Sequence, residues 1–197
     1  MRPFKVFPAL IIAFFLALNS TPSQAATYQV DKDHTVVSFK IRSFASAVQG
    51  FFRDFQGSVD YDPEKPETGA SRGTIEVKSI NTASSPRDRH LLSPDFFDAQ
   101  KFPQISFKSE KISGTGKTDA QMEGFLTIHG IEKPVSIEIH DLVLNKEPDG
   151  KEHLTFQATT KINRKDFGMT YSGAPFIGGA MLGDDVTITL QVDAVRD

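Results

Sequence analysis

Residues 186–193 read VTITLQVD, and this stretch decides the fold. Val186, Ile188, Leu190 and Val192 alternate with polar residues, which is the two-residue period of a strand with one buried face. Seven other segments are predicted strands: residues 37–41, 51–61, 74–78, 105–108, 124–129, 135–140 and 154–158. Strands that are apolar on one face and polar on the other predict an antiparallel sheet with one solvated side.

One of these segments breaks the alternation. Phe52 and Phe55 are three residues apart, so they cannot share a face of a regular strand. A bulge between them would bring both rings to the same side. Alternatively, Phe51 and Phe55 face the core and Phe52 faces solvent. The spacing alone leaves both arrangements open.

About eight such strands must bury their apolar faces together, as a sandwich or as a closed barrel. A barrel also removes the unpaired strand edges, and eight strands enclose either packed side chains or one small ligand. The inward residues are aliphatic and aromatic, and 13 of the 17 phenylalanines follow residue 25. They either fill the interior as ordinary core or line an apolar cavity.

Helical structure is predicted only near residues 86–100. Two Ser-Pro pairs, at residues 85–86 and 93–94, each place a capping residue before a proline, which is a pattern typical of helix starts. An aspartate follows each pair within the first turn, where it complements the helix dipole. Residues 87–92 and 95–100 are therefore predicted as two short helical segments.

The first 25 residues have the three parts of a cleavable secretory signal. A positively charged start precedes an apolar run over residues 6–18, and small residues at Ser23 and Ala25 mark a cleavage site. The run is shorter than the roughly 20 apolar residues of a membrane anchor. We therefore expect cleavage after Ala25 and one exported domain over residues 26–197, with no stable membrane insertion after cleavage.

The composition excludes cysteine-dependent chemistry and argues against some classes of partner. The chain has no cysteine, which excludes disulfides, thiol catalysis and cysteine-ligated metal. This fits a bacterial periplasm at least as well as a eukaryotic secretory route. The predicted signal holds two of the 22 basic residues and none of the 25 acidic ones, so the remainder carries a net charge of −5. A mildly acidic surface argues against a nucleic-acid partner.

Several segments, taken in order, resemble the YceI family. The first are Tyr28-x-x-Asp31-x-x-His34-x-x-Val37-x-Phe39 and Gly50-x-Phe52-x-x-Phe55-x-Gly57. The densest run is Ile80-x-Thr82, Arg87-Asp88-x-His90-Leu91, Asp95-Phe96-Phe97-Asp98 and Phe102-Pro103-x-Ile105-x-Phe107. Further matches are Gly124-x-Leu126-Thr127-x-His129-Gly130, Lys133-Pro134-Val135, Arg164-x-Asp166-Phe167-Gly168-Met169 and Gly183-Asp184-Asp185-Val186. Together they span essentially all of residues 26–197.

The resemblance implies an all-β, extended lipocalin-like, eight-stranded antiparallel barrel that holds a polyisoprenoid in its core. It also implies a periplasmic location and a link to quinone or isoprenoid handling, and it leaves a homodimer open. Two features depart from the family pattern. Ser43 stands where many relatives have a histidine, and the glycine-rich stretch over residues 172–182 is long enough to reshape one mouth of the barrel.

On this basis we predict a binding protein for an isoprenoid lipid or a quinone, with no cofactor and no metal. Most of the predicted ligand-binding residues are inward and apolar, and Arg87 and His90 add a polar end. The apolar set is Phe39, Ile41, Phe52, Phe55, Ile75, Val77, Phe96, Phe97, Phe107, Ile137, Phe156, Phe167, Met169 and Ile188.

Two other functions compete with this interpretation: an enzyme that uses the Arg87 and His90 region, and a structural or stress-response protein with a filled barrel. No spacing defines opposed carboxylates, and the five histidines lack metal-binding spacings, so we expect no enzyme. The segment around Arg87 and His90 is either a helix start with a local ion pair or a polar collar for a ligand head group. Arg164 and Asp166 either join that collar or pair with each other.

Overall fold

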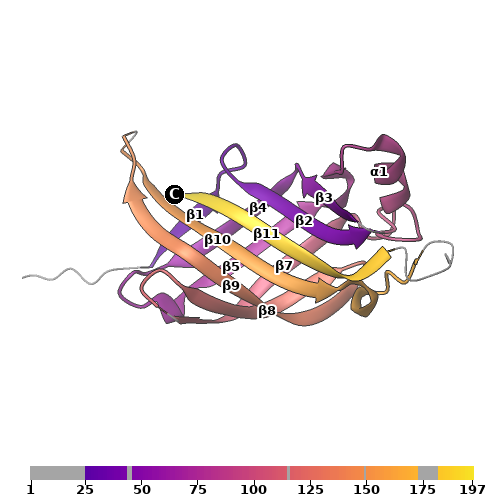
Figure 1. The fold of residues 1–197 in the computed structure, drawn as a ribbon. Helices are drawn as coiled ribbons and strands as arrows, with labels where there is room; N and C mark the ends of the chain where they lie inside the picture. The colour runs from indigo at the N-terminus through magenta and orange to yellow at the C-terminus, as the bar shows by residue number, and fades with distance from the viewer. Residues whose placement is uncertain (1–24, 44–45, 115, 149, 173–181) are drawn as a thin grey trace, which may run out of the picture.

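A computed structural model describes residues 25–43, 46–114, 116–148, 150–172 and 182–197 (Figure 1). The predicted signal lies outside these ranges except for Ala25, as does most of the glycine-rich stretch. The strands are β1 (Ala26–Val30), β2 (Val36–Ser43), β3 (Ser46–Phe52), β4 (Phe55–Tyr61), β5 (Ala70–Glu76), β6 (Ile80–Asn81), β7 (Gln104–Gly114), β8 (Ala120–Ile128), β9 (Ile131–Lys146), β10 (Glu152–Asn163) and β11 (Leu182–Arg196). The helices are α1 (Ser85–Leu91) and the 3₁₀ turns η1 (Pro66–Thr68), η2 (Val77–Ser79) and η3 (Arg164–Phe167). In the part of the chain so described, no helix combines the length and apolarity of a membrane span.

The sheet closes into an antiparallel barrel of eight strands. The ring runs β1-β4-β5-β7-β8-β9-β10-β11 and is completed by pairing of β11 with β1. The remaining strands extend the wall at one end, in the order β11-β2-β3-β6. Figure 1 places α1 at that end and the C-terminus at the other. The predicted eight-stranded antiparallel barrel is confirmed.

Eleven strands fill eight positions because three neighbouring strands are interrupted. β2 and β1 pair with successive parts of the long β11, and β3 and β4 follow each other in the same way. The interruptions lie at a similar height along the barrel, and hydrogen bonds and an ion pair link them. The backbone N–H of Asp31 donates to Asp193 O at 2.8 Å, and that of Glu76 donates to Asp54 O at 2.9 Å. Nζ of Lys32 meets Oδ1 of Asp54 at 2.6 Å.

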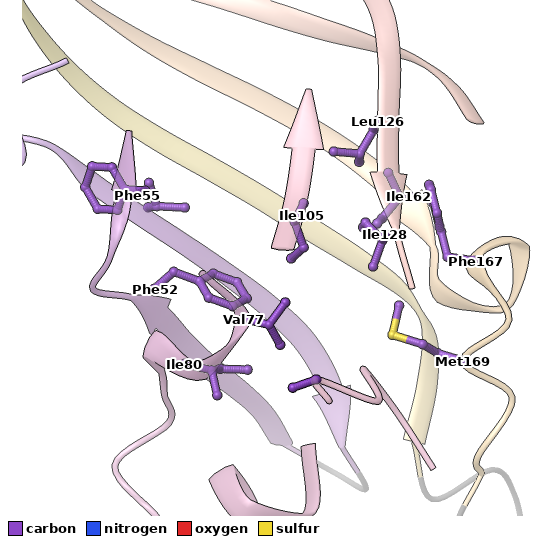
Figure 2. Packing of buried hydrophobic residues seen from close by; sticks show 12 residues of the cluster. Phe52, Phe55, Val77, Ile80, Ile105, Leu126, Ile128, Ile162, Phe167 and Met169 are labelled. Carbon is purple, nitrogen blue, oxygen red and sulfur yellow. The ribbon is translucent and has the colours of Figure 1, made fainter. Parts of the chain in front are cut away.

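The gap between β3 and β4 decides how the phenylalanines face. The segment predicted as a single strand over residues 51–61 stops at Phe52 and restarts at Phe55. Both rings are buried in one core cluster, whereas the guanidinium of Arg53 lies over the ring of Phe51, 5.5 Å from its centroid. The interruption thus brings Phe52 and Phe55 to the inner face, as the predicted bulge would. Figure 2 shows their side chains among the buried residues of that cluster.

Only the first of the two predicted helical segments is a helix. α1 ends at Leu91 because Pro94 disfavours helical backbone at Ser93. Residues 95–100, predicted as helical, form consecutive turns instead. The backbone at Asp98 is left-handed, with φ of 44°, and its N–H donates to Ser93 O at 2.9 Å. A left-handed residue ends the helical repeat, which explains why this part of the prediction was wrong.

The hairpin between β8 and β9 turns through only two residues, His129 and Gly130. Both have positive φ, 52° and 72°, as the twist of a tight hairpin requires. A Cβ at Gly130 would lie 2.4 Å from Cε1 of Phe102. The ring of Phe102 therefore packs directly on the glycine.

We expect Gly130→Ala to destabilise the protein by about 2 kcal/mol, because it combines a strained backbone with a clash. Urea unfolding measures the change. Gly150→Ala is the control, since Gly150 has φ of 85° but a Cβ added there would have no atom within 4 Å. Equal losses in both variants would show that contact with Phe102 does not matter.

Candidate functional site

The barrel interior contains an apolar cavity of about 500 Å³. Side chains from every strand of the closed ring line it, because inward positions recur every second residue. A cavity of this size lies within the range of small-molecule binding sites. The structure thus has a lined barrel rather than the filled barrel of the alternative interpretation.

Fourteen of the sixteen predicted ligand-binding residues lie on the cavity wall. They are Phe39, Ile41, Phe52, Phe55, Ile75, Arg87, His90, Phe96, Phe97, Phe107, Ile137, Phe156, Met169 and Ile188. Some of their aromatic rings pack against one another. The ring centroids of Phe39 and Phe52 are 5.7 Å apart, and those of Phe52 and Phe97 are 6.2 Å apart. Whether these side chains contact a ligand stays a prediction.

Val77 and Phe167 do not line the cavity, although both were predicted to. Val77 begins η2, so it leaves the alternation of β5, and its N–H donates to Pro103 O at 2.9 Å. Phe167 ends η3, and its carbonyl lies 3.2 Å from Nδ1 of His129. Both residues are 1% exposed and belong to the buried cluster that also contains wall residues such as Phe52 and Met169 (Figure 2). The prediction treated them as inward wall positions, but both lie in 3₁₀ turns beside the strands.

The sequence interpretation also missed part of the wall. Leu190 and Val192 continue the inward phase of residues 186–193, and Val135 shares the phase of Ile137, so alternation could have identified them. Gly57 and Gly73 line the cavity with backbone alone. No pattern in the sequence marks a glycine as part of a wall.

Arg87 is held by the loop before α1. Its Nε donates to Oγ1 of Thr82 at 2.7 Å, and Nη2 donates to the Thr82 carbonyl at 2.8 Å. Oγ1 and the N–H of Thr82 both donate to Oδ1 of Asp88, at 2.6 and 2.9 Å. Thr82 thus links Arg87 to Asp88, in place of the direct local ion pair that one interpretation offered, and Arg87 also lies at the cavity.

His90 belongs to a cluster of aromatic rings at the α1 end of the cavity. Its ring packs edge-on against Phe96 and Tyr171, with centroids 5.1 and 4.9 Å away. Nε2 of His90 bonds to Oδ2 of Asp95 at 2.9 Å. Both contacts orient the ring, so His90 serves as part of the mouth of the cavity.

Arg164 is the most deeply buried charged side chain of the described residues, at 2% exposure. It pairs with Asp184, with Nη2 and Oδ1 at 3.1 Å, and not with Asp166 as one prediction had it. Nε donates to Gly183 O at 2.9 Å, and Nη1 donates to Met169 O. Burial lowers the pKa of Arg164, while Asp184 opposes that change. Each of its three guanidinium nitrogens thus has an acceptor in the protein, and the carboxylate of Asp184 balances its charge.

The remaining histidines of the barrel each have a hydrogen-bond partner. His140 lies 3.0 Å from Asp119, His153 lies 2.8 Å from Asp193, and His129 bonds to a carbonyl. Among the described residues, no group of three or more histidine and acidic side chains is arranged to hold a metal ion.

Asp31 and His34 join β1 to β2 outside the cavity. Oδ2 of Asp31 accepts from Nδ1 of His34 at 2.8 Å. This bond raises the pKa of His34 above its usual 6.5 and lowers the pKa of Asp31. The stabilisation through His34 is complete below about pH 6.5 and is lost as the pH rises through the raised value. The stabilisation through Asp31 is present above about pH 3.8 and is lost as the pH falls through the lowered pKa of Asp31.

We expect an NMR titration to place the His34 midpoint above 6.5, and Asp31→Asn to return it to the ordinary value. Asp33→Asn is the matched control, because Asp33 is adjacent in sequence yet contributes least of the causes that raise the pKa of His34. A midpoint that does not respond to Asp31→Asn would contradict the assignment.

A closed antiparallel barrel around one apolar cavity defines the lipocalin-like class of folds. The chain belongs to the YceI family, since the family model of the YceI-like domain matches residues 28–194. A UPF0312 protein of Pseudomonas putida strain W619 is 36% identical over 173 residues, which cover 86% of this chain and 90% of the relative.

Solved structures agree with this assignment. The crystal structure of Burkholderia cenocepacia BcnA superposes with a TM-score of 0.73 at 25% identity, over 84% of this chain and 99% of BcnA. A polyisoprenoid binding domain from Saccharophagus degradans superposes with a TM-score of 0.65 at 11% identity, over 88% of this chain and all of that domain. At that identity the second likeness establishes the fold alone.

Proposed function

We propose that this protein binds a long isoprenoid lipid, such as a polyprenyl chain or a quinone with a polyprenyl tail, and carries it through the periplasm. The observation that carries the proposal is the apolar cavity inside the closed barrel. The fold likeness to a domain described as polyisoprenoid binding supports the choice of ligand.

The chemistry of the wall favours an uncharged hydrocarbon chain. The guanidinium of Arg164 already donates to three acceptors, and that of Arg87 is bonded to Thr82. Both side chains line the cavity, but their hydrogen bonds are directed to protein acceptors. A buried ion without a partner is strongly unfavourable. The interior therefore suits the tail of a lipid and leaves any polar head at the mouth.

Burial alone can hold such a tail. Each methylene removed from water contributes roughly 0.8 kcal/mol, and dispersion contacts with the surrounding side chains add to this. Several isoprene units would bind tightly without any hydrogen bond. The cost of taking the lipid from a membrane is then offset by a similarly apolar environment in the protein.

The test is to purify the processed protein from its own host, extract it with organic solvent, and identify the extract by mass spectrometry. We expect an isoprenoid lipid in near-stoichiometric amount. Protein refolded from denaturant and extracted in parallel is the control for lipid carried over from membranes. Extracts without isoprenoid, or with a different lipid class, would contradict the proposal.

The periplasmic location rests on the predicted signal and has its own test. We expect the mature N-terminus to be Ala26 and the protein to be released with the periplasmic fraction. Ala25→Arg should block processing, because signal peptidase sites require a small residue there. An intact N-terminus in the membrane fraction would contradict the carrier role.

A further inference from the structure

The cavity ends at a common level on neighbouring strands. On β11, Val192 lines the cavity but the next inward residue, Ala194, does not. On β10, Phe156 lines it but Leu154 does not. Ala194 and Leu154 are both 0% exposed, and the two are paired across the strands. The cavity therefore stops here because side chains fill the barrel.

Strands β8 and β9 repeat this limit. On β8, Met122 lines the cavity and Ala120 does not, and on β9 the same is true of Ile137 and Ile139. Ala120 and Ile139 are a cross-strand pair, and both are buried. The limit thus recurs on four successive strands of the ring, β8 to β11, rather than at one residue pair.

Tyr28 continues the limit on β1. Its neighbour on the inner face, Val30, lines the cavity, whereas Tyr28 does not and is 2% exposed. Burial is the main reason that the pKa of Tyr28 is raised, and the negative charge of Glu152 raises it further. Glu152 is itself paired with Arg196. The ring of Tyr28 is therefore held by core packing.

We call Tyr28, Ala120, Ile139, Leu154 and Ala194 the floor. At the opposite end, beside α1, the exposed residues Arg87, Tyr171 and Ser172 line the cavity. Tyr171 is 38% exposed. Among the described residues, the cavity wall thus meets packed core at the floor, and its exposed members lie beside α1, apart from Gln56 and Arg72 on β4 and β5.

We propose that the floor limits the length of the prenyl chain that the cavity can bury. The prenyl tail enters first, its end reaches the floor, and the head group stays at the α1 end. The depth of the cavity then sets a maximum number of isoprene units that can be buried. This inference rests on the proposed function and adds a direction and a length limit to it.

The test uses delipidated protein and linear all-trans prenyl alcohols from farnesol to decaprenol, compared in pairs by competition in native mass spectrometry. Below the limit, each added isoprene unit should raise the affinity by at least about tenfold, because its carbons are newly buried. Beyond the limit, added units stay in solvent and the affinity should level off. An affinity that keeps rising with length would overturn the length limit while leaving lipid binding intact.

Substitutions that make the cavity shallower should reduce the maximum number of isoprene units that it can bury. Val192→Phe adds about four carbon atoms at the deepest lining position of β11, close to the size of one isoprene unit. The preferred alcohol should become one unit shorter, with short alcohols unaffected. Val59→Phe makes the same change on β4, in case the first variant folds poorly. Val143→Phe is the matched control, because Val143 is exposed on the outside of the barrel. An unchanged limit in both cavity variants would refute the role of the floor.

Photoreactive prenyl alcohols establish the direction. A diazirine at the tail end should crosslink to Val59 or Val192, and one beside the hydroxyl should crosslink to His90 or Tyr171. The reverse labelling would overturn the tail-first orientation. If no alcohol of any length binds, the proposed function itself fails, and the length limit fails with it.

Discussion

Replacing Gly73 by phenylalanine should leave the barrel folded and reduce isoprenoid affinity by about fiftyfold or more. Gly73 lies on the inner face, paired with Gly57 on one side and with Phe107 on the other. The nearest atom to a Cβ there is the Gln56 carbonyl oxygen at 3.3 Å, so only a small adjustment is needed. The ring would displace at least about three methylene groups of the ligand, each worth roughly 0.8 kcal/mol.

Gly114→Phe is the matched control for this change. Gly114 ends β7, is exposed, and would have no atom within 4 Å of an added Cβ. It should bind like the unmodified protein. Lipid content is measured by extraction, affinity by prenyl alcohol competition, and folding by circular dichroism. Full lipid content in a folded Gly73→Phe protein would show that the ligand does not occupy this cavity.

Arg164→Ala should lower the free energy of unfolding by about 3 kcal/mol. The substitution removes a buried side chain and leaves the Gly183 and Met169 carbonyls without their donors. Unsatisfied buried polar groups and lost buried partners have costs of this size. The ties from η3 to the start of β11 and to Met169 on the cavity wall are lost together. Urea unfolding monitored by circular dichroism measures the loss.

Two controls separate burial from charge at this site. Lys165→Ala removes the exposed partner of the same carboxylate, whose Nζ lies 2.8 Å from Oδ2 of Asp184, and should leave the midpoint nearly unchanged. Arg164→Lys keeps the charge but cannot reach three acceptors from one planar group, so it should fall between the two. A stability loss in Arg164→Ala no larger than in Lys165→Ala would refute the structural role.

Alternation predicted most of the wall because side-chain direction in a strand depends only on residue parity. Phe39, Ile41 and Ile188 were therefore placed correctly on the inner face from their spacing. The same rule failed at Val77, because η2 ends β5 one residue earlier. It was silent at Gly73, because parity says nothing about a residue without a side chain.

The strand interruptions could not be predicted in detail from the local sequence pattern. The gap after Phe52 depends on contacts with segments distant in sequence: Arg53 N–H donates to Ser79 O, and Lys32 meets Asp54. The spacing of Phe52 and Phe55 signalled an irregularity but not its form. The left-handed turn at Asp98 likewise overrode a capping signal that was sound for α1 alone.

The sequence by itself determined that this chain forms an antiparallel sheet with one apolar face, because a two-residue period over eight segments is typical of such strands. It also carried the motifs of the YceI family. The choice of a barrel over a sandwich came from the family resemblance. Only the tertiary structure decided that the barrel has a cavity with an end, and that Arg164 bonds to Asp184 instead of Asp166. A cavity is the volume that side chains from different strands fail to fill, and a buried charge takes the partner that folding brings nearest. Both depend on distances between residues far apart in the chain, which no local pattern contains.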